Sequence, residues 1–370
     1  VLFAGIGFVF FKDYSSSARN NKIVRKLLNP TNFISATASY IKKVRRANRQ
    51  FTVIDDDPNH VPYEDPYYTV LILMICETAR AKNFSLNGYD RETNPKLARQ
   101  DIVNFRNVTA SGTATAFSLP CMFSHLPRAR FNIDDSYQSE NLLDVMQKAG
   151  YDVLWMDNDG GSKGVARRVP YIDLMKEGNP EFRNGDTFFD EVLLDGLEDR
   201  LKNISKDTVL VLHMMGSHGP SYYKRYPDAF RKFAPTCDSA EIQNFPTEEI
   251  VNTYDNTILY TDHVVSGAID ILKKFPQYEA GLLYVSDHGE SLGENGLYLH
   301  GFPYAFAPEE QTRVPMVLWM SETMTREDHV DYEKLKADAV PLQLSHDHLF
   351  HSVLGLVEIE SEFYYLTLNF

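Results

Sequence analysis

The amino-acid sequence predicts an α/β fold, a three-layer α/β/α sandwich with a mostly parallel central sheet. Four near-continuous apolar runs have the length of buried strands, and segments with helical periodicity lie between them. This alternation is typical of a parallel sheet that is covered by helices on both faces. The runs are residues 69–76, 151–156, 208–212 and 281–286.

The first 60 residues differ in composition from the rest of the chain. Residues 1–11 are wholly apolar, and because a membrane-spanning helix needs roughly 20 such residues, we interpret them as the end of a transmembrane helix. A short buried core segment is the alternative. Residues 12–50 hold ten Lys or Arg side chains and one acid, Asp13. We expect residues 12–60 to form a basic juxtamembrane helix and linker at an anionic membrane surface, although a solvated helix face would have the same composition.

Residues 61–370 are expected to form the catalytic domain. The pattern of apolar residues predicts helices at residues 140–148 and 247–274 within it. Residues 140–148 are amphipathic and end before Gly150, which suits the C′ position. Residues 247–274 carry a long apolar stripe and end before Pro276. For a chain with a net charge of −14 we expect no nucleic-acid partner.

Each of the four predicted strands ends in polar residues of catalytic type. These ends are Glu77, then Asp157-Asn158-Asp159, then His213 with His218 five residues on, and finally Asp287-His288. Ligands of open α/β sheets bind at the carboxyl ends of the strands. The sequence therefore predicts a site along one edge of the sheet, and the Asp-His pair supplies half of a zinc site.

A hydroxyl-rich segment, residues 111–118, precedes a predicted helix that Pro120 interrupts early. A threonine at a helix N-terminus, such as Thr115, experiences the positive end of the helix dipole. Beside Zn²⁺ its hydroxyl could ionise and act as a nucleophile. Taken alone, the segment favours an ordinary helix cap.

Several long motifs, in one order, resemble a known family. They are CETAR at 76–80 with NFSLNGY at 83–89, GTATAFSLPCMFS at 112–124, SKGV at 162–165, GSHGPSYYKRYP at 216–227, YDNTILYTD at 254–262 and SDHGESLGENGLYLHG at 286–301. They look like the phosphoethanolamine transferases of the alkaline phosphatase and sulfatase superfamily, which include lipid A-modifying enzymes of polymyxin resistance. The resemblance runs from Leu2 to Leu356.

The resemblance implies one tightly bound Zn²⁺ with Glu77, Thr115, Asp287 and His288 as ligands, and Thr115 as the nucleophile. Three of these ligands also follow from the strand-end argument.

The resemblance further implies that Lys163, His218 and His300 face the phosphoethanolamine group and take part in catalysis. Glu290 would be close by, in contact with the substrate. A second zinc could lie near His218 and His300.

The implied reaction moves phosphoethanolamine from phosphatidylethanolamine to lipid A of lipopolysaccharide or lipooligosaccharide, through a phospho-threonine intermediate. The product would resist polymyxins and cationic peptides, and the enzyme would be a monomer in the bacterial inner membrane with a periplasmic catalytic domain. A core sugar is an alternative acceptor. Alternative functions are a phosphoglycerol transferase or phosphodiesterase, or a non-catalytic lipid-binding scaffold; the Cys/Ser-x-Pro-x-Arg motif of sulfatases is absent around Thr115.

The chain also departs from the family pattern. Cys76 stands where the family has Gly, which puts the geometry of Glu77 in question. We expect no intact family disulfide, because the expected partners are replaced: Ser111 for Cys121, Phe245 for Cys237, and Ser162 with Ala166 in a further pair.

Three other groups have ordinary explanations. His213 would be explained equally well as a buried histidine that donates to a carbonyl. The cluster around His346 fits a helix 349–357 capped by Ser345 or Asp347 better than a metal site. Residues 222–225 could meet a lipid headgroup or form a solvated loop.

Overall fold

The structure is a computed structural model that describes residues 31–47, 49–60, 66–327 and 330–369. The expected end of a transmembrane helix, residues 1–11, lies outside the described residues, as do residues 12–30. Helix α4 (Thr31–Ala47) occupies part of the basic segment. Among the described helices, none combines the length and the apolar character that a membrane crossing requires.

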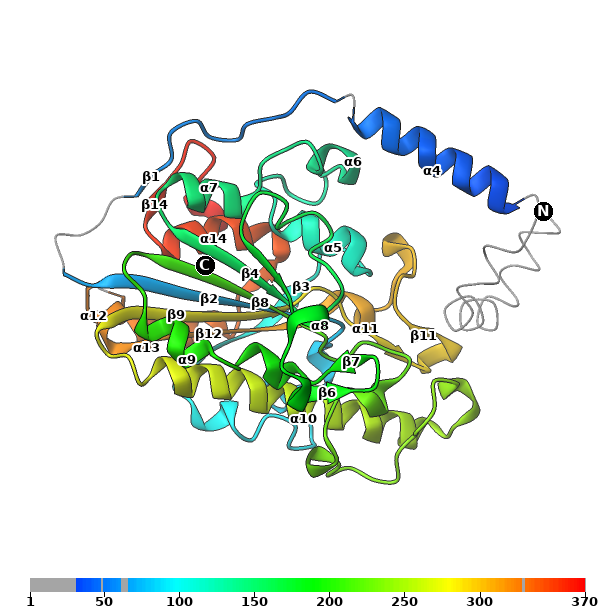
Figure 1. The fold of residues 1–370 in the computed structure, drawn as a ribbon. Coiled ribbons are helices and arrows are strands. Elements are labelled where there is room, and N and C mark those ends of the chain that lie inside the picture. The colour runs from blue at the N-terminus through cyan, green and yellow to red at the C-terminus, as the bar shows by residue number, and fades with distance from the viewer. Residues whose placement is uncertain (1–30, 48, 61–65, 328–329, 370) are drawn as a thin grey trace.

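An eight-stranded sheet forms the centre of the fold, in the order β13-β3-β12-β9-β2-β8-β4-β5. Every strand but β12 runs in the same direction, so the predicted mostly parallel sheet is confirmed (Figure 1). The strands are β2 (Tyr68–Cys76), β3 (Val103–Thr109), β4 (Asp152–Asp157), β5 (Tyr171–Asp173), β8 (Thr208–Met214), β9 (Tyr278–Ser286), β12 (Arg313–Met320) and β13 (Gln343–Ser345).

The four predicted strands are neighbours in the sheet. Strands β9, β2, β8 and β4 are adjacent and parallel, and their register places Cys76 opposite both Ser286 and Met214. Their carboxyl ends are therefore level with one another. The prediction of a single polar edge is confirmed, although β8 continues to Met214 instead of ending at residue 212.

The other four strands were not singled out from the sequence. Strand β12 is apolar but contains Pro315, which lacks the N–H that a ladder requires. The structure accommodates it with a register shift between Val314 and Met316. Strand β3 has alternating burial, and β5 and β13 are only three residues long.

Helices cover both faces of the sheet, as predicted (Figure 1). On β2, Val70, Ile72 and Met74 join the hydrophobic core under α10, whereas Leu71 and Leu73 join the core under α7 and α14. The longer helices are α5 (Thr115–Met122), α7 (Leu142–Lys148), α9 (Leu197–Lys202), α10 (Thr247–Leu272), α12 (Glu322–Glu327), α13 (Tyr332–Ala339) and α14 (Leu349–Leu356).

In the described part of the chain, the connections hold short elements. These are helices α6 (Ile133–Ser136), α8 (Leu174–Glu177) and α11 (Glu309–Thr312), and the two-residue strand pairs β1 (Asn59–His60) with β14 (Ile359–Glu360), β6 (Arg183–Asn184) with β7 (Thr187–Phe188), and β10 (Ser291–Leu292) with β11 (Tyr298–Leu299).

Three helix boundaries refine the sequence predictions. Helix α7 begins two residues later than predicted, because the side chain of Asn141 caps it. Gly150 takes a left-handed conformation at its C′ position, with φ +103°, as expected. The prediction that Pro120 interrupts α5 was wrong: the helix continues to Met122. In so short a helix, the proline removes a single i→i−4 hydrogen bond.

Cys76 is accommodated by a glycine on the neighbouring segment. Its thiol is fully buried, and a Cβ at Gly216 would lie 2.5 Å from Cys76 Sγ and 2.5 Å from the carbonyl oxygen of Glu77. Gly216 also has φ +53°. The space that Cys76 needs beside Glu77 is therefore left by Gly216.

The three cysteines are free, buried thiols. Burial raises the pKa of Cys121 to about 12, and the nearby Ser111 hydroxyl offsets part of this increase. Ser111 thus lies beside Cys121, at the position where the resemblance implies a disulfide partner.

We predict that Gly216→Ala lowers the free energy of unfolding by about 2–3 kcal/mol, because the new Cβ collides with Cys76 and Glu77 in a strained backbone. Gly185→Ala is the matched control, since Gly185 has φ +63° and a Cβ added there would meet no other part of the chain within 4 Å. It should cost only about 1 kcal/mol. If urea denaturation gives equal losses of unfolding free energy for the two variants, the role of Gly216 is limited to its backbone conformation.

Candidate active site

The carboxyl edge of the sheet brings the predicted metal ligands together. Glu77 follows β2, Asp287 and His288 follow β9, and Thr115 is the first residue of α5. All four side chains are buried, and Thr115 is 7% exposed. Residues more than 200 positions apart in the chain therefore share one enclosed space.

Thr115 lies at the centre of this cluster. Its hydroxyl donates a hydrogen bond to Glu77 Oε2, and its Oγ1 is 3.3 Å from His288 Nε2. His288 Nε2 is also 3.4 Å from Glu77 Oε1 and 3.6 Å from Asp287 Oδ2. The potential nucleophile thus contacts both an acid and a base.

The backbone holds the ligands in place. Asp287 Oδ1 accepts hydrogen bonds from the N–H groups of His288 (2.7 Å) and Thr78 (3.3 Å). His288 Nδ1 donates to the carbonyl oxygen of Gly289 at 2.9 Å. This bond holds a proton on Nδ1 and directs Nε2 toward the cluster, the orientation of many metal-binding histidines.

The cluster has the features of a cation site. Glu77 Oε1 and Asp287 Oδ2 are buried and have no hydrogen-bond partner among the residues that the structure describes. Such orphaned oxygens cost free energy unless a partner compensates them. A divalent cation would provide that compensation, and a mixed set of carboxylate oxygens and an imidazole nitrogen suits Zn²⁺. The residues present therefore fit the metal that the sequence predicts.

The electrostatics of the cluster also favour a cation. Burial alone would lower the pKa of His288, but the charges of Asp287 and Glu77 outweigh it and raise this pKa to about 10. Burial and the charge of Glu77 raise the pKa of Asp287 to about 7. Two buried carboxylates thus hold a proton or a positive charge between them.

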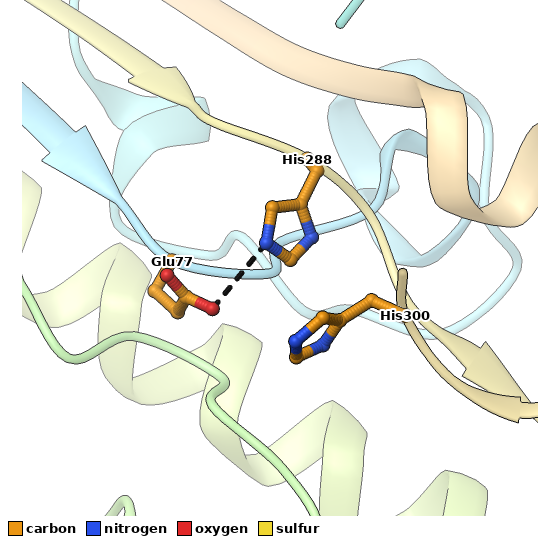
Figure 2. A group of neighbouring side chains, drawn as sticks. All are labelled: Glu77, His288 and His300. Carbon is orange, nitrogen blue, oxygen red and sulfur yellow. Dashed lines mark ion pairs between the residues drawn. The ribbon is translucent and has the colours of Figure 1, made fainter. Parts of the chain in front are cut away.

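His300 joins the cluster from the loop after β11. Ligand atoms of Glu77, His288 and His300 lie within 4.8 Å of one another, and Figure 2 shows the three side chains directed toward a shared space. The rings of His288 and His300 are 4.5 Å apart between centroids. His300 is therefore positioned beside the predicted ligands.

Glu290 lies behind His300 and is fully buried. Its Oε2 is 2.8 Å from His300 Nδ1, and its Oε1 accepts a hydrogen bond from Tyr222 at 3.0 Å. Both oxygens contact protein groups, and the predicted substrate contact of Glu290 stays a prediction. Tyr222 is 1% exposed, and the predictions of a solvated loop or a lipid contact at residues 222–225 were wrong for it.

His218 and Lys163 meet at a carboxylate that sequence reasoning did not assign. His218 Nδ1 is 3.5 Å from Asp159 Oδ1 and 3.7 Å from Glu77 Oε1. Lys163 Nζ is 3.7 Å from Asp159 Oδ2 and donates to the carbonyl oxygen of Gly161 at 3.0 Å. Glu77, Asp159 and His218 form a second group with metal-ligand spacing. The polar end of β4 was the available signal for Asp159.

His213 is buried, but it lies between two carboxylates and not beside the carbonyl acceptor of the alternative explanation. Its Nδ1 is 2.9 Å from Asp157 Oδ2, and its Nε2 is 3.7 Å from Asp159 Oδ2. Burial alone would lower the pKa of His213, but these carboxylates outweigh it and raise the pKa. A buried charge network therefore continues from β4 and β8 toward His218.

His346 was not predicted to contact the site. Ser345 accepts a hydrogen bond from the N–H of Asp347, but it caps the 3-10 turn His346–His348 that precedes α14, and α14 itself has no side-chain cap. His346 itself is 2% exposed and lies against the segment before Thr115 and the end of β9. Burial lowers its pKa to about 3, so it is neutral. Strand β13, which precedes it, is too short to be recognised from its sequence.

Comparison with known proteins agrees with the sequence resemblance. A family model described as Sulfatase matches residues 69–359, and one described as Phosphoethanolamine transferase EptA/EptB matches residues 1–44. The integral membrane lipooligosaccharide phosphoethanolamine transferase A of Neisseria meningitidis superimposes with a TM-score of 0.88 at 43% identity, over 99% of this chain and 69% of that one. The chain belongs to the phosphoethanolamine transferase family.

Other members are similar over most of the chain. The soluble domain of the Neisseria meningitidis enzyme gives a TM-score of 0.85 at 44% identity, over 87% of this chain and 97% of that one. Phosphoethanolamine transferase EptA of Escherichia coli K12 is 47% identical over 96% of this chain, and phosphatidylethanolamine transferase Mcr-1 of Escherichia coli is 36% identical over 95%. The chain spans 66% of the length of each of these two relatives.

The contact between Asp157, at the end of β4, and His213 predicts that the free energy of unfolding depends on pH in the acid range. Burial alone would raise the pKa of Asp157, but the hydrogen bond and charge of His213 outweigh it and lower the pKa from 3.8 to about 2. A depressed carboxyl pKa contributes stability above the unfolded-state value, and this contribution is lost as the pH falls toward 2. It amounts to about 2 kcal/mol.

We therefore expect the difference in unfolding free energy between the wild type and Asp157→Asn to shrink by about 2 kcal/mol from pH 5 to pH 2. Urea denaturation across this range would measure it. Asp152→Asn, at an exposed carboxylate paired with Lys206, is the control and should leave the curves parallel. Parallel curves for Asp157→Asn would refute a charged contact with His213.

Proposed function

We propose that this chain is the catalytic part of a zinc-dependent phosphoethanolamine transferase. The donor is phosphatidylethanolamine, and the acceptor is lipid A of lipopolysaccharide or lipooligosaccharide. One observation carries the proposal: the Thr115 hydroxyl, at the N-terminus of α5, contacts Glu77 and His288 within a buried cluster of carboxylates and histidines. Such an arrangement pairs a nucleophile with groups that activate it.

Glu77, Asp287 and His288, with the Thr115 oxygen, would hold the zinc. The orphaned oxygens of Glu77 and Asp287 and the Nε2 of His288 support this assignment. The ion would supply positive charge that favours the ionised hydroxyl and offsets charge on the phosphoryl oxygens. A second ion near His218 and His300 belongs to the same proposal, and the spacing of Glu77, Asp159 and His218 supports it.

The first step transfers the phosphoethanolamine group to the enzyme. Thr115 Oγ1 forms a bond to phosphorus, and the bond from phosphorus to the glycerol oxygen breaks. Thr115 loses its proton, and the leaving oxygen of diacylglycerol gains one. We assign these proton transfers to His218 and His300, whose imidazole rings lie beside the cluster with 5.9 Å between their centroids.

The second step transfers the group to the acceptor. A phosphate or hydroxyl oxygen of lipid A attacks the phosphorus of phospho-Thr115, and the threonine oxygen leaves. Lys163 and the two histidines offset negative charge on the phosphoryl oxygens during both steps. Glu290 acts indirectly, since its carboxylate orients His300 and both of its oxygens are occupied.

The product would carry a new ammonium group. Lower negative charge on lipid A weakens the binding of polymyxins and other cationic peptides, so the activity would confer resistance to them. The proposed setting is the bacterial inner membrane with the catalytic domain, residues 61–370, in the periplasm and acting as a monomer. Helix α4 supports membrane association, because it exposes Phe33, Ile34, Tyr40, Ile41 and Val44.

Peptide mass spectrometry of the zinc-loaded chain with phosphatidylethanolamine in detergent tests the proposal. We expect one phosphoethanolamine increment on the peptide that contains Thr115. Thr115→Val, which keeps the shape but lacks the hydroxyl, should show none. Thr115→Ser should still be modified, because it keeps the nucleophile.

Adding lipid A should discharge the adduct and regenerate the unmodified peptide. Loading from phosphatidylglycerol instead would assign the phosphoglycerol transferase function. A chain that binds zinc and hydrolyses the donor without transfer would be a phosphodiesterase. A chain that shows no adduct and no zinc would be the lipid-binding scaffold.

A further inference from the structure

A histidine outside the described cluster connects two of its parts. His346 follows β13, whose residue Ser345 pairs with Thr109 at the end of β3. It is thus a further polar residue just beyond the carboxyl end of a parallel strand, at the edge where the site lies. Its side chain is buried, and it contacts neither Glu77 nor Thr115 directly in the hydrogen bonds of the described residues.

The two ring nitrogens of His346 bind different segments. Nδ1 accepts a hydrogen bond from the N–H of Ser111 at 3.1 Å, four residues before Thr115. Nε2 donates to the carbonyl oxygen of Ser286 at 3.0 Å, one residue before Asp287. These bonds fix a single neutral tautomer. One imidazole therefore joins the segment that leads to the nucleophile with the strand end that carries two predicted ligands.

A serine on α5 strengthens the same connection. Ser118 is fully buried, its hydroxyl donates to the carbonyl oxygen of Asp287, and its Oγ is 3.3 Å from His346 Nδ1. Helix α5 is thus tied to the end of β9 directly through Ser118 and indirectly through His346. Ser111, Ser118, Ser286 and His346 are all at most 2% exposed.

Neighbouring contacts fix the rest of the Ser111 segment. Arg128 Nε donates to the carbonyl oxygen of Ser111 at 2.7 Å, and Thr113 donates to the carbonyl oxygen of Phe302 at 2.7 Å. The N–H of Gly301, next to His300, donates to the carbonyl oxygen of Thr113 at 2.6 Å. Several contacts thus hold the segment from Ser111 to Thr115 in place, and His346 connects this segment to the end of β9.

We infer that His346 is a positioning residue, which sets the distance between Thr115 and the Asp287-His288 pair by bridging Ser111 and Ser286. Small displacements of reacting groups have large effects, because a shift of about 1 Å can cost on the order of 100-fold in rate. The kinetic consequence of this inference rests on the proposed function. The bridge, meaning the two hydrogen bonds of His346 to Ser111 and Ser286, does not depend on the proposed function.

Substitutions of His346 separate its two bonds. His346→Leu removes both, His346→Asn keeps a polar group near Nδ1, and His346→Gln keeps one near Nε2. His351→Leu is the matched control: His351 is also buried on the C-terminal segment, but its Nδ1 accepts from the N–H of Tyr365, away from the cluster. A general loss of packing would affect both positions alike.

The kinetic test measures single-turnover loading of Thr115 in the zinc-loaded full chain at saturating phosphatidylethanolamine. We expect His346→Leu to slow loading on the order of 100-fold, while the KM for the donor changes by less than about threefold. His346→Asn and His346→Gln should each be slow, and His351→Leu should load at the wild-type rate. Loading by His346→Leu at the His351→Leu rate would overturn the inference.

Hydrogen–deuterium exchange tests the bridge without reference to activity. Exchange of the Ser111 amide should accelerate in His346→Leu and His346→Gln, and should stay near the wild-type rate in His346→Asn and His351→Leu. Unchanged exchange in His346→Leu would overturn the bridge. If His346→Leu does not fold, the Asn and Gln variants decide the question. Failure of the wild type to load Thr115 would contradict the proposed function, and exchange would still decide the bridge.

Discussion

The buried carboxylate of Glu77 is the group on which the site depends. It accepts a hydrogen bond from Thr115, lies 3.4 Å from His288 and lies 3.7 Å from His218. A buried carboxylate costs several kcal/mol unless neighbouring groups compensate its charge. Each compensating group comes from a different segment, so the fold must hold several distant parts of the chain in register.

The sheet and a second layer of contacts meet this requirement together. Parallel pairing brings the ends of β9, β2, β8 and β4 level, which fixes where the backbone leaves each strand. The orientation of the side chains in the site is then set by residues that surround them. Glu290 orients His300, Asp159 contacts His218, and Gly216 leaves room for Cys76 beside Glu77. The side chains that would face a substrate are therefore held in place by other side chains that would not contact it.

The sequence predicted the strands with continuous apolar runs and the polar residues that directly follow them, because both signals are local. Contacts between segments that are distant in the chain could not be predicted from the sequence. The polar end of β4 marked Asp159 as a candidate, but its contacts with His218 and Lys163, like the role of His346, depend on which segments the fold brings together. Glu290 was assigned to the substrate by resemblance, and its contact with His300 is visible only in the structure. Strand β12 was not predicted because it contains Pro315, and a proline argues against a central strand.

We propose that the side chains of Glu77, Thr115, Asp287 and His288 together hold a zinc ion. Anomalous diffraction at the zinc absorption edge, on crystals of the zinc-loaded protein, tests it most directly. We expect a strong peak at about 2.0–2.2 Å from the oxygen and nitrogen atoms of these side chains. A zinc peak confined to another part of the molecule, or no peak between these residues at saturating zinc, would contradict it.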